Sequence, residues 1–214
     1  MNKPFDECFE AYDKWYDAPA GKTIFTAETK CLKLLGGSFS GRWLEIGVGT
    51  GRFASGLGIR EGIDPSLPMI RMAAARGIHT YAGHGEQLPF EAECFDGLLM
   101  ALSLCFIPVP DQALNECFRV LKPTGHLLVG VVPAESEWGR LYIRKKSEGH
   151  PLYSLATFRS ASDIINLVKS AGFNLQRAAS TLFWKPDALA ETSPQVDDGI
   201  SSNAGFISLL FRKN

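Results

Sequence analysis

The stretch from Leu44 to Phe53, LEIGVGTGRF, constrains the fold of this chain more than any other segment. A short apolar run leads into a glycine-rich turn, and the turn leads into residues that suit the start of a helix. Glycines let the backbone pass close to a ligand, and the free N–H groups at a helix start attract polar or anionic groups. The segment therefore predicts an α/β unit that binds a nucleotide-like cofactor.

The spacing of the glycines separates two kinds of cofactor. A dinucleotide-binding fingerprint has a third glycine three positions after the second. Here Arg52 stands three positions after Gly49, and Gly47, Gly49 and Gly51 alternate instead. Glu45, two positions before the first glycine, would repel phosphates but could face a cationic amine. The spacing disfavours a pyrophosphate ligand and leaves a purely structural glycine turn as the alternative.

A second acidic residue, Asp64, follows Glu45 at the distance where a neighbouring strand would end. In nucleotide-binding α/β folds, a carboxylate about twenty residues after the glycine turn accepts hydrogen bonds from ribose hydroxyls. The alternative is that Asp64 or Ser66 caps the helix expected over residues 67–76. Both roles can hold together because Asp64 precedes the cap.

Composition places the chain among compact α/β proteins. Its 214 residues are 45% hydrophobic and carry a formal net charge of -1, so we expect a single domain over residues 1–214. A near-neutral balance gives no electrostatic footprint for nucleic acid. The longest apolar run, residues 97–109, is shorter than the roughly 18 residues of a membrane span. We therefore expect neither a nucleic-acid nor a membrane partner.

The cysteines and histidines indicate compartment and metal content. Five cysteines without close pairs, and an N-terminus without a leader pattern, favour reduced thiols in a cytoplasmic protein. The four histidines lack metal-ligand spacing, so no metal site is expected.

Apolar periodicity predicts the remaining elements. Residues 1–40 suggest two helices, residues 95–105 a central strand buried on both faces, and residues 133–158 an insertion after the strand at 126–132. The two runs 173–183 and 204–211 predict a final antiparallel pair. The polar segment 185–203 between them is expected on the surface.

Taken in order, these motifs resemble class I S-adenosylmethionine (SAM) dependent methyltransferases, and more narrowly their small-molecule type 11 branch. The resemblance covers residues 12–211 and rests on the glycine turn, Asp64, the 83–90 segment GHGEQLPF and Phe95–Asp96. It implies a Rossmann-like, mostly parallel seven-stranded sheet with a final antiparallel strand, and SAM as cofactor with S-adenosylhomocysteine as product. The implied cofactor-binding residues are Tyr16, Glu45, Gly47, Gly49, Gly51, Asp64, Pro65, Gly85, Glu86, Ala101 and Leu102.

The resemblance also implies where an acceptor would bind. Residues 1–40 would form lid helices over the cofactor, and the 133–158 insertion would supply a wall of the acceptor site. Tyr12, Trp138 and Tyr142 are the candidate acceptor contacts. Packing against the sheet is an equal alternative for Tyr12 and Tyr16, as is anchoring of the insertion to the core for Trp138.

The chemistry of methyl transfer leaves the acceptor open. The Asp/Asn-Pro-Pro-Tyr signature of amide-nitrogen and DNA methyltransferases is missing after the 95–105 strand. Displacement at a sulfonium methyl needs no protein nucleophile, so no catalytic residue is assigned. The leading hypothesis is a methyltransferase for a small-molecule acceptor, acting as a monomer or homodimer. The alternatives are a non-catalytic SAM-binding module and, less favoured, a nucleotide-dependent oxidoreductase.

Overall fold

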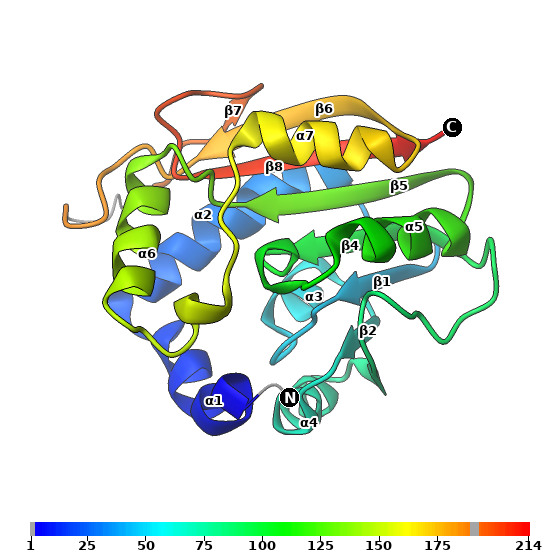
Figure 1. Cartoon of the computed structure of the whole chain (residues 1–214), viewed down its shortest axis with the longest axis horizontal. Helices are drawn as coiled ribbons and strands as arrows, with labels where there is room; N and C mark the ends of the chain where they lie inside the picture. The colour runs from blue at the N-terminus through cyan, green and yellow to red at the C-terminus, as the bar shows by residue number, and fades with distance from the viewer. Residues whose placement is uncertain (1–2, 189–192) are drawn as a thin grey trace.

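The computed structural model describes residues 3–188 and 193–214 and shows one eight-stranded sheet between two layers of helices (Figure 1). The strands are β1 (Trp43–Ile46), β2 (Glu61–Asp64), β3 (His79–Ala82), β4 (Phe95–Ala101), β5 (Leu121–Val131), β6 (Phe173–Thr181), β7 (Asp197–Asp198) and β8 (Phe206–Lys213). The α-helices are α1 (Lys3–Trp15), α2 (Pro19–Gly36), α3 (Arg52–Leu57), α4 (Leu67–Ala75), α5 (Pro110–Val120), α6 (Glu137–Ser147) and α7 (Ala161–Ser170), and two short 3-10 helices are η1 (Leu104–Phe106) and η2 (Tyr153–Leu155).

The strand order is β3-β2-β1-β4-β5-β8-β6-β7, and β1 to β5 are parallel. Strand β8 runs antiparallel between β5 and β6. This arrangement confirms the predicted Rossmann-like sheet with its antiparallel final strand. The chain order reverses between β1 and β4, and ligands of open α/β sheets bind beyond the carboxyl ends of the strands at such a point.

The sheet has one strand more than the seven expected. Strand β7 comes from the 185–203 segment, of which residues 189–192 lie outside the described residues. Hydroxyl groups of β6 hold this segment against the sheet, because Thr181 donates to the carbonyl of Gln195 at 2.6 Å and Ser180 to that of Gly199 at 2.7 Å. The two residues of β7 then pair with β6 at the edge of the sheet.

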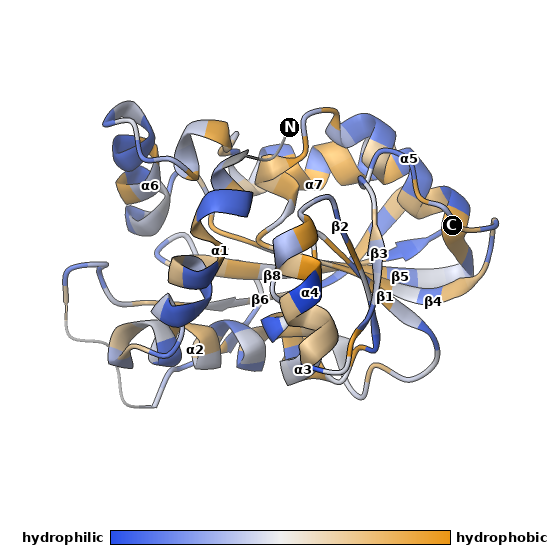
Figure 2. Ribbon diagram, turned by 90° about the horizontal axis from the view of Figure 1, so that it is seen from below, coloured by the Kyte–Doolittle hydropathy of each residue, from blue (hydrophilic) through white to orange (hydrophobic). Residues whose placement is uncertain are grey.

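Two apolar cores fill the spaces on either side of the sheet. In β4, Leu98 and Met100 join the core under α5 and α7, whereas Leu99 and Ala101 join the core under α2 and α3. This alternation is the period of two that a strand covered on both faces requires. Figure 2 shows α5 and α7 on one side of the sheet and α2 and α3 on the other.

Strand β4 ends at Ala101, four residues earlier than predicted. Leu102 adopts a left-handed conformation with φ of 58°, which breaks the extended strand. The hydroxyl of Ser103 then donates to the carbonyl of Ile46 at 2.6 Å. The chain therefore crosses the end of β1 and brings residues 101–103 beside the glycine turn.

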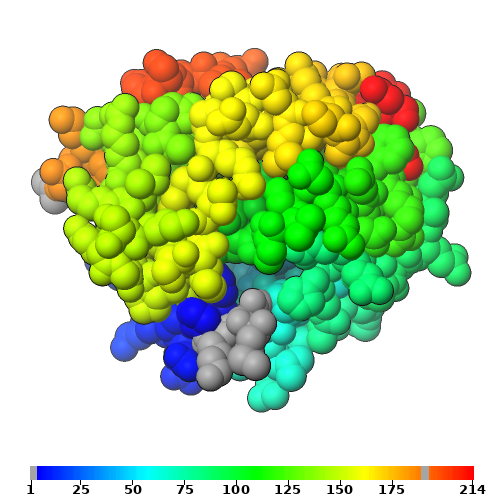
Figure 3. All heavy atoms as spheres, in the orientation of Figure 1, coloured from blue at the N-terminus to red at the C-terminus, as the bar shows by residue number. Residues whose placement is uncertain are grey.

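The N-terminal segment forms the two predicted helices. Helix α2 packs on the sheet, and α1 lies below the carboxyl ends of the central strands, near α4 (Figure 1). In the space-filling view, α1 in blue lies beneath the yellow-green 133–158 insertion (Figure 3). Within the described residues, no helix combines the length and apolar character needed to cross a membrane.

Candidate active site

A cavity of about 210 Å³ lies beyond the carboxyl ends of β1, β2 and β4. Most of the residues proposed for cofactor binding meet there, although they come from four separate segments of the chain. The expected residues that line it are Gly47, Gly49, Asp64, Pro65, Gly85, Glu86, Ala101 and Leu102.

The glycine turn is shaped by steric limits at two positions. Gly47 has φ of 74°, and a Cβ atom there would stand 2.4 Å from the Cβ atom of Ser103. Gly49 has φ of 52°, and its N–H donates to Asp64 Oδ2 at 3.0 Å. Side chains at these positions would be strained and, at Gly47, would collide with the chain after β4.

Gly51 is placed differently from the other two glycines. It does not line the cavity, and a Cβ atom there would stand 2.8 Å from the Cβ atom of Ala73 on α4. With a φ of 81°, Gly51 also occupies the N-cap position immediately before α3. The third glycine is therefore explained by close packing of the turn against α4 rather than by contact with the cavity.

Asp64 lies at the end of β2 with its carboxylate held by backbone amides. Oδ1 accepts from the N–H of Ser66 at 2.8 Å, and Oδ2 accepts from Gly49. Burial raises the pKa of Asp64, and these two hydrogen bonds oppose the rise. The Ser66 hydroxyl separately caps α4 at Met69 N. Asp64 thus lines the cavity while Ser66 caps the helix, so the two roles fall on different residues.

Glu45 is buried beside the glycine turn, with 1% of its surface exposed. It borders a small space together with Tyr12 and Tyr16. Its Oε2 atom has no hydrogen-bond partner among the described residues, and burial raises its pKa well above the ordinary value. An unpaired buried carboxyl oxygen fits a cationic amino group, such as the one that SAM carries at its amino-acid end.

A second cavity, of about 410 Å³, adjoins the first. The two share four lining residues, Phe5, Tyr12, Leu102 and Phe106. Tyr16 and Tyr142 also line the second cavity, and the ring of Tyr142 stacks on that of Tyr153 with centroids 4.6 Å apart. The expected lid residues Tyr12 and Tyr16 and the insertion residue Tyr142 therefore meet around one aromatic space.

Trp138 lies away from this space. Its side chain is 5% exposed and belongs to the core beneath α2. The indole N–H donates to the carbonyl of Trp184 at 2.8 Å, and Gly205 leaves the room that the ring fills. Trp138 therefore anchors the insertion to the core, as in the second of the two alternatives. It does not line the aromatic cavity, where the acceptor contact was expected.

Sequence reasoning missed Glu28, a buried carboxyl group in the second cavity. The sequence did contain a signal for its burial. Glu28 lies on the same helical stripe as the apolar residues Ile24, Ala27 and Cys31. A lone acidic residue in such a stripe marks either a satisfied buried group or a ligand contact. Ser103 was also missed, because its place at the end of β1 depends on the early end of β4.

Three charged residues attach α1 to the glycine turn. Arg52, which occupies the position of a dinucleotide-fold glycine, donates from Nε and Nη2 to the carboxylate of Asp13, both at 2.8 Å. Arg76 donates to the same carboxylate at 2.7 Å. Burial raises the pKa of Asp13, but the hydrogen bonds from the two guanidinium groups outweigh it and lower the pKa to about 2.

We expect Asp13→Asn to destabilise the protein. It would leave the Arg52 and Arg76 guanidinium groups close together without the carboxylate between them, at a cost on the order of 2 kcal/mol. Urea unfolding at neutral pH measures this change. Asp17→Asn is the matched control, because the Asp17 side chain is 66% exposed and its pair with Arg52 contributes little. Equal effects of the two variants would contradict the assignment.

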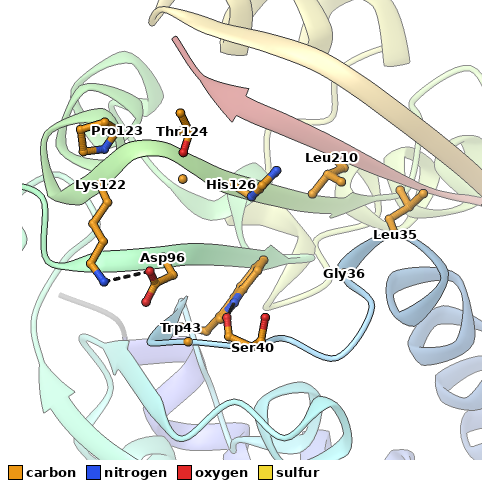
Figure 4. Close-up of a pocket in the computed structure, with 12 residues that line it drawn as sticks. Leu35, Gly36, Ser40, Trp43, Asp96, Lys122, Pro123, Thr124, His126 and Leu210 are labelled. Carbon is orange, nitrogen blue, oxygen red and sulfur yellow. Dashed lines mark hydrogen bonds and ion pairs between the residues drawn. The ribbon is translucent and has the colours of Figure 1, made fainter.

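A third hollow, of about 460 Å³, lies at the opposite end of the central strands from these two cavities (Figure 4). It is bordered by the residues that begin β1, β4 and β5, including Trp43 and the ion pair between Lys122 Nζ and Asp96 Oδ1 at 2.8 Å. It is larger than either cavity described above. Its position at the amino ends of the strands is the wrong end for a ligand of an open α/β sheet.

Comparison with known proteins shows which family has this fold and these sequence motifs. Residues 44–129 match the Methyltransf_11 family, described as a methyltransferase domain. The crystal structure of a Thermotoga maritima SAM-dependent methyltransferase, described as a possible histamine N-methyltransferase, superimposes with a TM-score of 0.91 at 35% identity, covering 99% of each chain. This chain belongs to the class I SAM-dependent methyltransferases.

Two curated relatives share this methyltransferase sequence over most of its length. One is an uncharacterized protein from Methanocaldococcus jannaschii, 36% identical over 98% of each chain. The other is an uncharacterized protein from Mycobacterium tuberculosis, 37% identical over 93% of this chain and 70% of its own. The cofactor of this methyltransferase is SAM. No group of three or more potential metal ligands occurs in residues 3–188 and 193–214.

Proposed function

We propose that this methyltransferase transfers the SAM methyl group to a small-molecule acceptor bound in the aromatic cavity. The observation that carries the proposal is the adjacency of the two cavities, which share Tyr12 and Leu102. An acceptor in the larger cavity would thus face the reactive end of a cofactor in the smaller one. The acceptor named in the description of the Thermotoga protein, histamine, is also a small molecule.

The cofactor-binding roles follow the positions of the lining residues. Asp64 would accept hydrogen bonds from the ribose hydroxyls, and Glu45 would pair with the amino group. Gly85 and Glu86, with Pro65, border the side of the cavity where an adenine ring would lie. Ala101 and Leu102 would border the methionine end of the cofactor. Gly51 would support the turn from outside.

The chain's contribution to the reaction is positioning in a dry pocket. Bound SAM supplies a methyl group activated by a sulfonium centre. Holding an acceptor in near-attack geometry can lower a barrier by roughly 7 to 11 kcal/mol. The faces of Tyr12 and Tyr16 suit a cationic centre, because the ring quadrupole attracts positive charge. Hydrophobic residues such as Phe106 and Leu102 would exclude water.

The remaining parts of the proposal concern the whole chain. Residues 1–214 would act as one domain, with residues 1–40 as a lid held by the ion pairs of Asp13. None of the five cysteines forms a disulfide in the structure, which supports a cytoplasmic location. The near-neutral charge supports a small-molecule partner rather than nucleic acid. A monomer or a homodimer fits the proposal equally.

Calorimetry followed by a transfer assay tests the proposed function. The protein is titrated with SAM, S-adenosylhomocysteine and NADH, and then incubated with methyl-labelled SAM and a panel of small amines, phenols and thiols. We expect saturable binding of the two adenosyl ligands, no binding of NADH, and label transfer to at least one acceptor class. Binding without transfer to any acceptor would favour the non-catalytic SAM-binding module.

We expect Asp64→Ala to weaken SAM binding by about 1 to 3 kcal/mol, because the ribose hydroxyls would lose their acceptor. Calorimetric titration measures the affinity, and circular dichroism checks that the variant is folded. Ser66→Ala is the matched control, since it removes the cap of α4 without removing the carboxylate. Unchanged affinity in a folded Asp64→Ala protein would contradict the ribose assignment.

A further inference from the structure

We propose that Glu28 recognises a protonated nitrogen on the acceptor, so that the aromatic cavity selects amines over uncharged molecules of the same shape. This inference rests on the proposed function and adds the class of acceptor to it. It concerns recognition and is independent of which atom of the acceptor is methylated.

The first supporting observation is the state of the Glu28 side chain. It projects from the buried face of α2, is 3% exposed, and lines the second cavity. Its Oε2 atom has no hydrogen-bond partner, and no ion pair to Glu28 occurs among residues 3–188 and 193–214. A buried carboxyl group without a partner is costly, so proteins normally satisfy such groups with a hydrogen bond or a counter-charge. Here the missing partner can come from the cavity.

The second observation is the aromatic lining around this carboxyl group. Tyr12 of α1, Tyr16 just after α1 and Tyr142 of α6 border the same cavity. Burial and, to a smaller extent, the nearby Glu28 charge raise the pKa of all three phenol groups. Aromatic faces attract cations, and a carboxylate at the same place adds a full negative charge. An anionic or uncharged acceptor would gain little from this combination, whereas an alkylammonium group would interact with both.

Neither cationic side chain beside these rings fills the role, because the Arg52 guanidinium over the Tyr16 ring is already paired with Asp13. Lys145 lines the cavity, but its Nζ atom lies over the rings of Tyr142 and Tyr153, 6.0 and 5.9 Å from their centroids. No ion pair joins Lys145 to Glu28 in the described residues. Burial alone accounts for the rise in the pKa of Glu28 to about 8. The position opposite the carboxyl group is thus left for a ligand.

Binding of an ammonium group in this cavity should also release a proton from the Glu28 carboxyl group to the buffer. Near pH 7 the Glu28 carboxyl group is mostly protonated, because its pKa is about 8. An adjacent ammonium group favours the carboxylate, so the carboxyl proton passes to the buffer when the amine binds. The other titratable or charged groups that line this cavity are Cys8, Tyr12, Tyr16, Tyr142, Lys145, His150 and Tyr153. Two groups lie just outside it: Cys31, whose pKa is raised by burial and by the Glu28 charge, and Glu45, whose charge acts on Tyr12.

The experiment compares amines with their alcohol isosteres on protein saturated with S-adenosylhomocysteine. The pairs are 2-phenylethylamine with 2-phenylethanol, and tyramine with tyrosol, titrated at pH 7 in two buffers of different ionisation enthalpy. For the wild-type protein we expect at least one amine to bind about tenfold or more tightly than its alcohol, with net proton release. Glu28→Gln should reduce the preference to what the aromatic rings alone provide, abolish the proton release, and leave the affinity for S-adenosylhomocysteine unchanged.

Three further variants separate recognition from other effects. Glu10→Gln makes the same charge change on the exposed face of α1 and should preserve the preference. Glu28→Asp keeps the charge and should retain part of it. His150→Gln removes the imidazole that also lines the cavity, and proton release should persist.

The outcomes distinguish this inference from the proposed function. Failure of S-adenosylhomocysteine to bind would overturn the proposed function itself. Normal cofactor binding with no amine preferred over its alcohol, or a preference undiminished in Glu28→Gln, would overturn only the role of Glu28. Tighter binding of the alcohols would also overturn it, because a protonated Glu28 would then act as an ordinary hydrogen-bond donor.

Discussion

Replacing Trp138 by alanine is expected to lower the free energy of unfolding by about 3 to 5 kcal/mol, the usual cost of removing a buried aromatic side chain. The indole ring is enclosed in the core beneath α2, beside Trp184 and Gly205. Its N–H group donates to the carbonyl of Trp184 at 2.8 Å. The variant would therefore lose both the packing and the hydrogen bond that join the start of α6 to the segment after β6.

Urea unfolding at constant pH measures the change, and calorimetry with SAM measures the remaining cofactor affinity of the folded variant. Ile143→Ala is the matched control on the same helix, because Ile143 is 42% exposed and should change stability little. A folded Trp138→Ala protein with wild-type stability and a specific loss of acceptor binding would restore Trp138 as a wall of the acceptor site.

Trp138, for which the sequence left acceptor contact and anchoring to the core as equal alternatives, shows where sequence reasoning stops. An aromatic residue in an insertion after a parallel strand can face the ligand or the core, and the sequence has the same pattern in both cases. Tyr142, four positions later on the same helix, does face the cavity. Which of the two points inward depends on how α6 packs on the rest of the molecule, and that is set by distant residues such as Trp184.

The cavity beyond the carboxyl ends of β1, β2 and β4 was easier to predict because its signals are local. Gly47 and Gly49 need positive φ, and Asp64 ends a short apolar strand, so each can be recognised within a few residues of sequence. Sheet order then follows from the family resemblance. The early end of β4 at Leu102 has no such signal, because nothing in its side chain favours the left-handed conformation that it adopts.

Long-range charge pairs could not be predicted at all. Asp13 lies 39 positions from Arg52 and 63 from Arg76 in the sequence, yet the three side chains are in direct contact. Charged residues on a helix are usually solvated, so an acidic residue in α1 gave no reason to expect a partner on α3. This cluster fixes α1 next to the glycine turn, and it explains why arginine stands where a dinucleotide-binding fold has glycine.

Glu28→Gln is expected to stabilise the ligand-free protein by about 3 kcal/mol at pH 7, with a gain that depends on pH. The carboxyl group has a pKa of about 8 when folded, against an ordinary value of 4.5. Below pH 4.5 both states are protonated and the group costs nothing through ionisation. Between pH 4.5 and 8 the unfolded chain ionises while the folded chain keeps its proton, so the penalty on folding grows. Above pH 8 the penalty is constant.

Urea unfolding of both proteins between pH 4 and 8.5 measures this dependence, and the difference in free energy should vanish near pH 4. Burial raises the pKa values of the nearby Tyr12, Tyr16 and Tyr142, and that of Cys31 to about 11, so these four groups do not ionise over this range. An equal gain at every pH would instead indicate better packing of the amide. A pH-dependent gain would mean that the fold tolerates a destabilising carboxyl group that faces the aromatic cavity. Such a cost is expected when a residue is kept for a ligand rather than for stability.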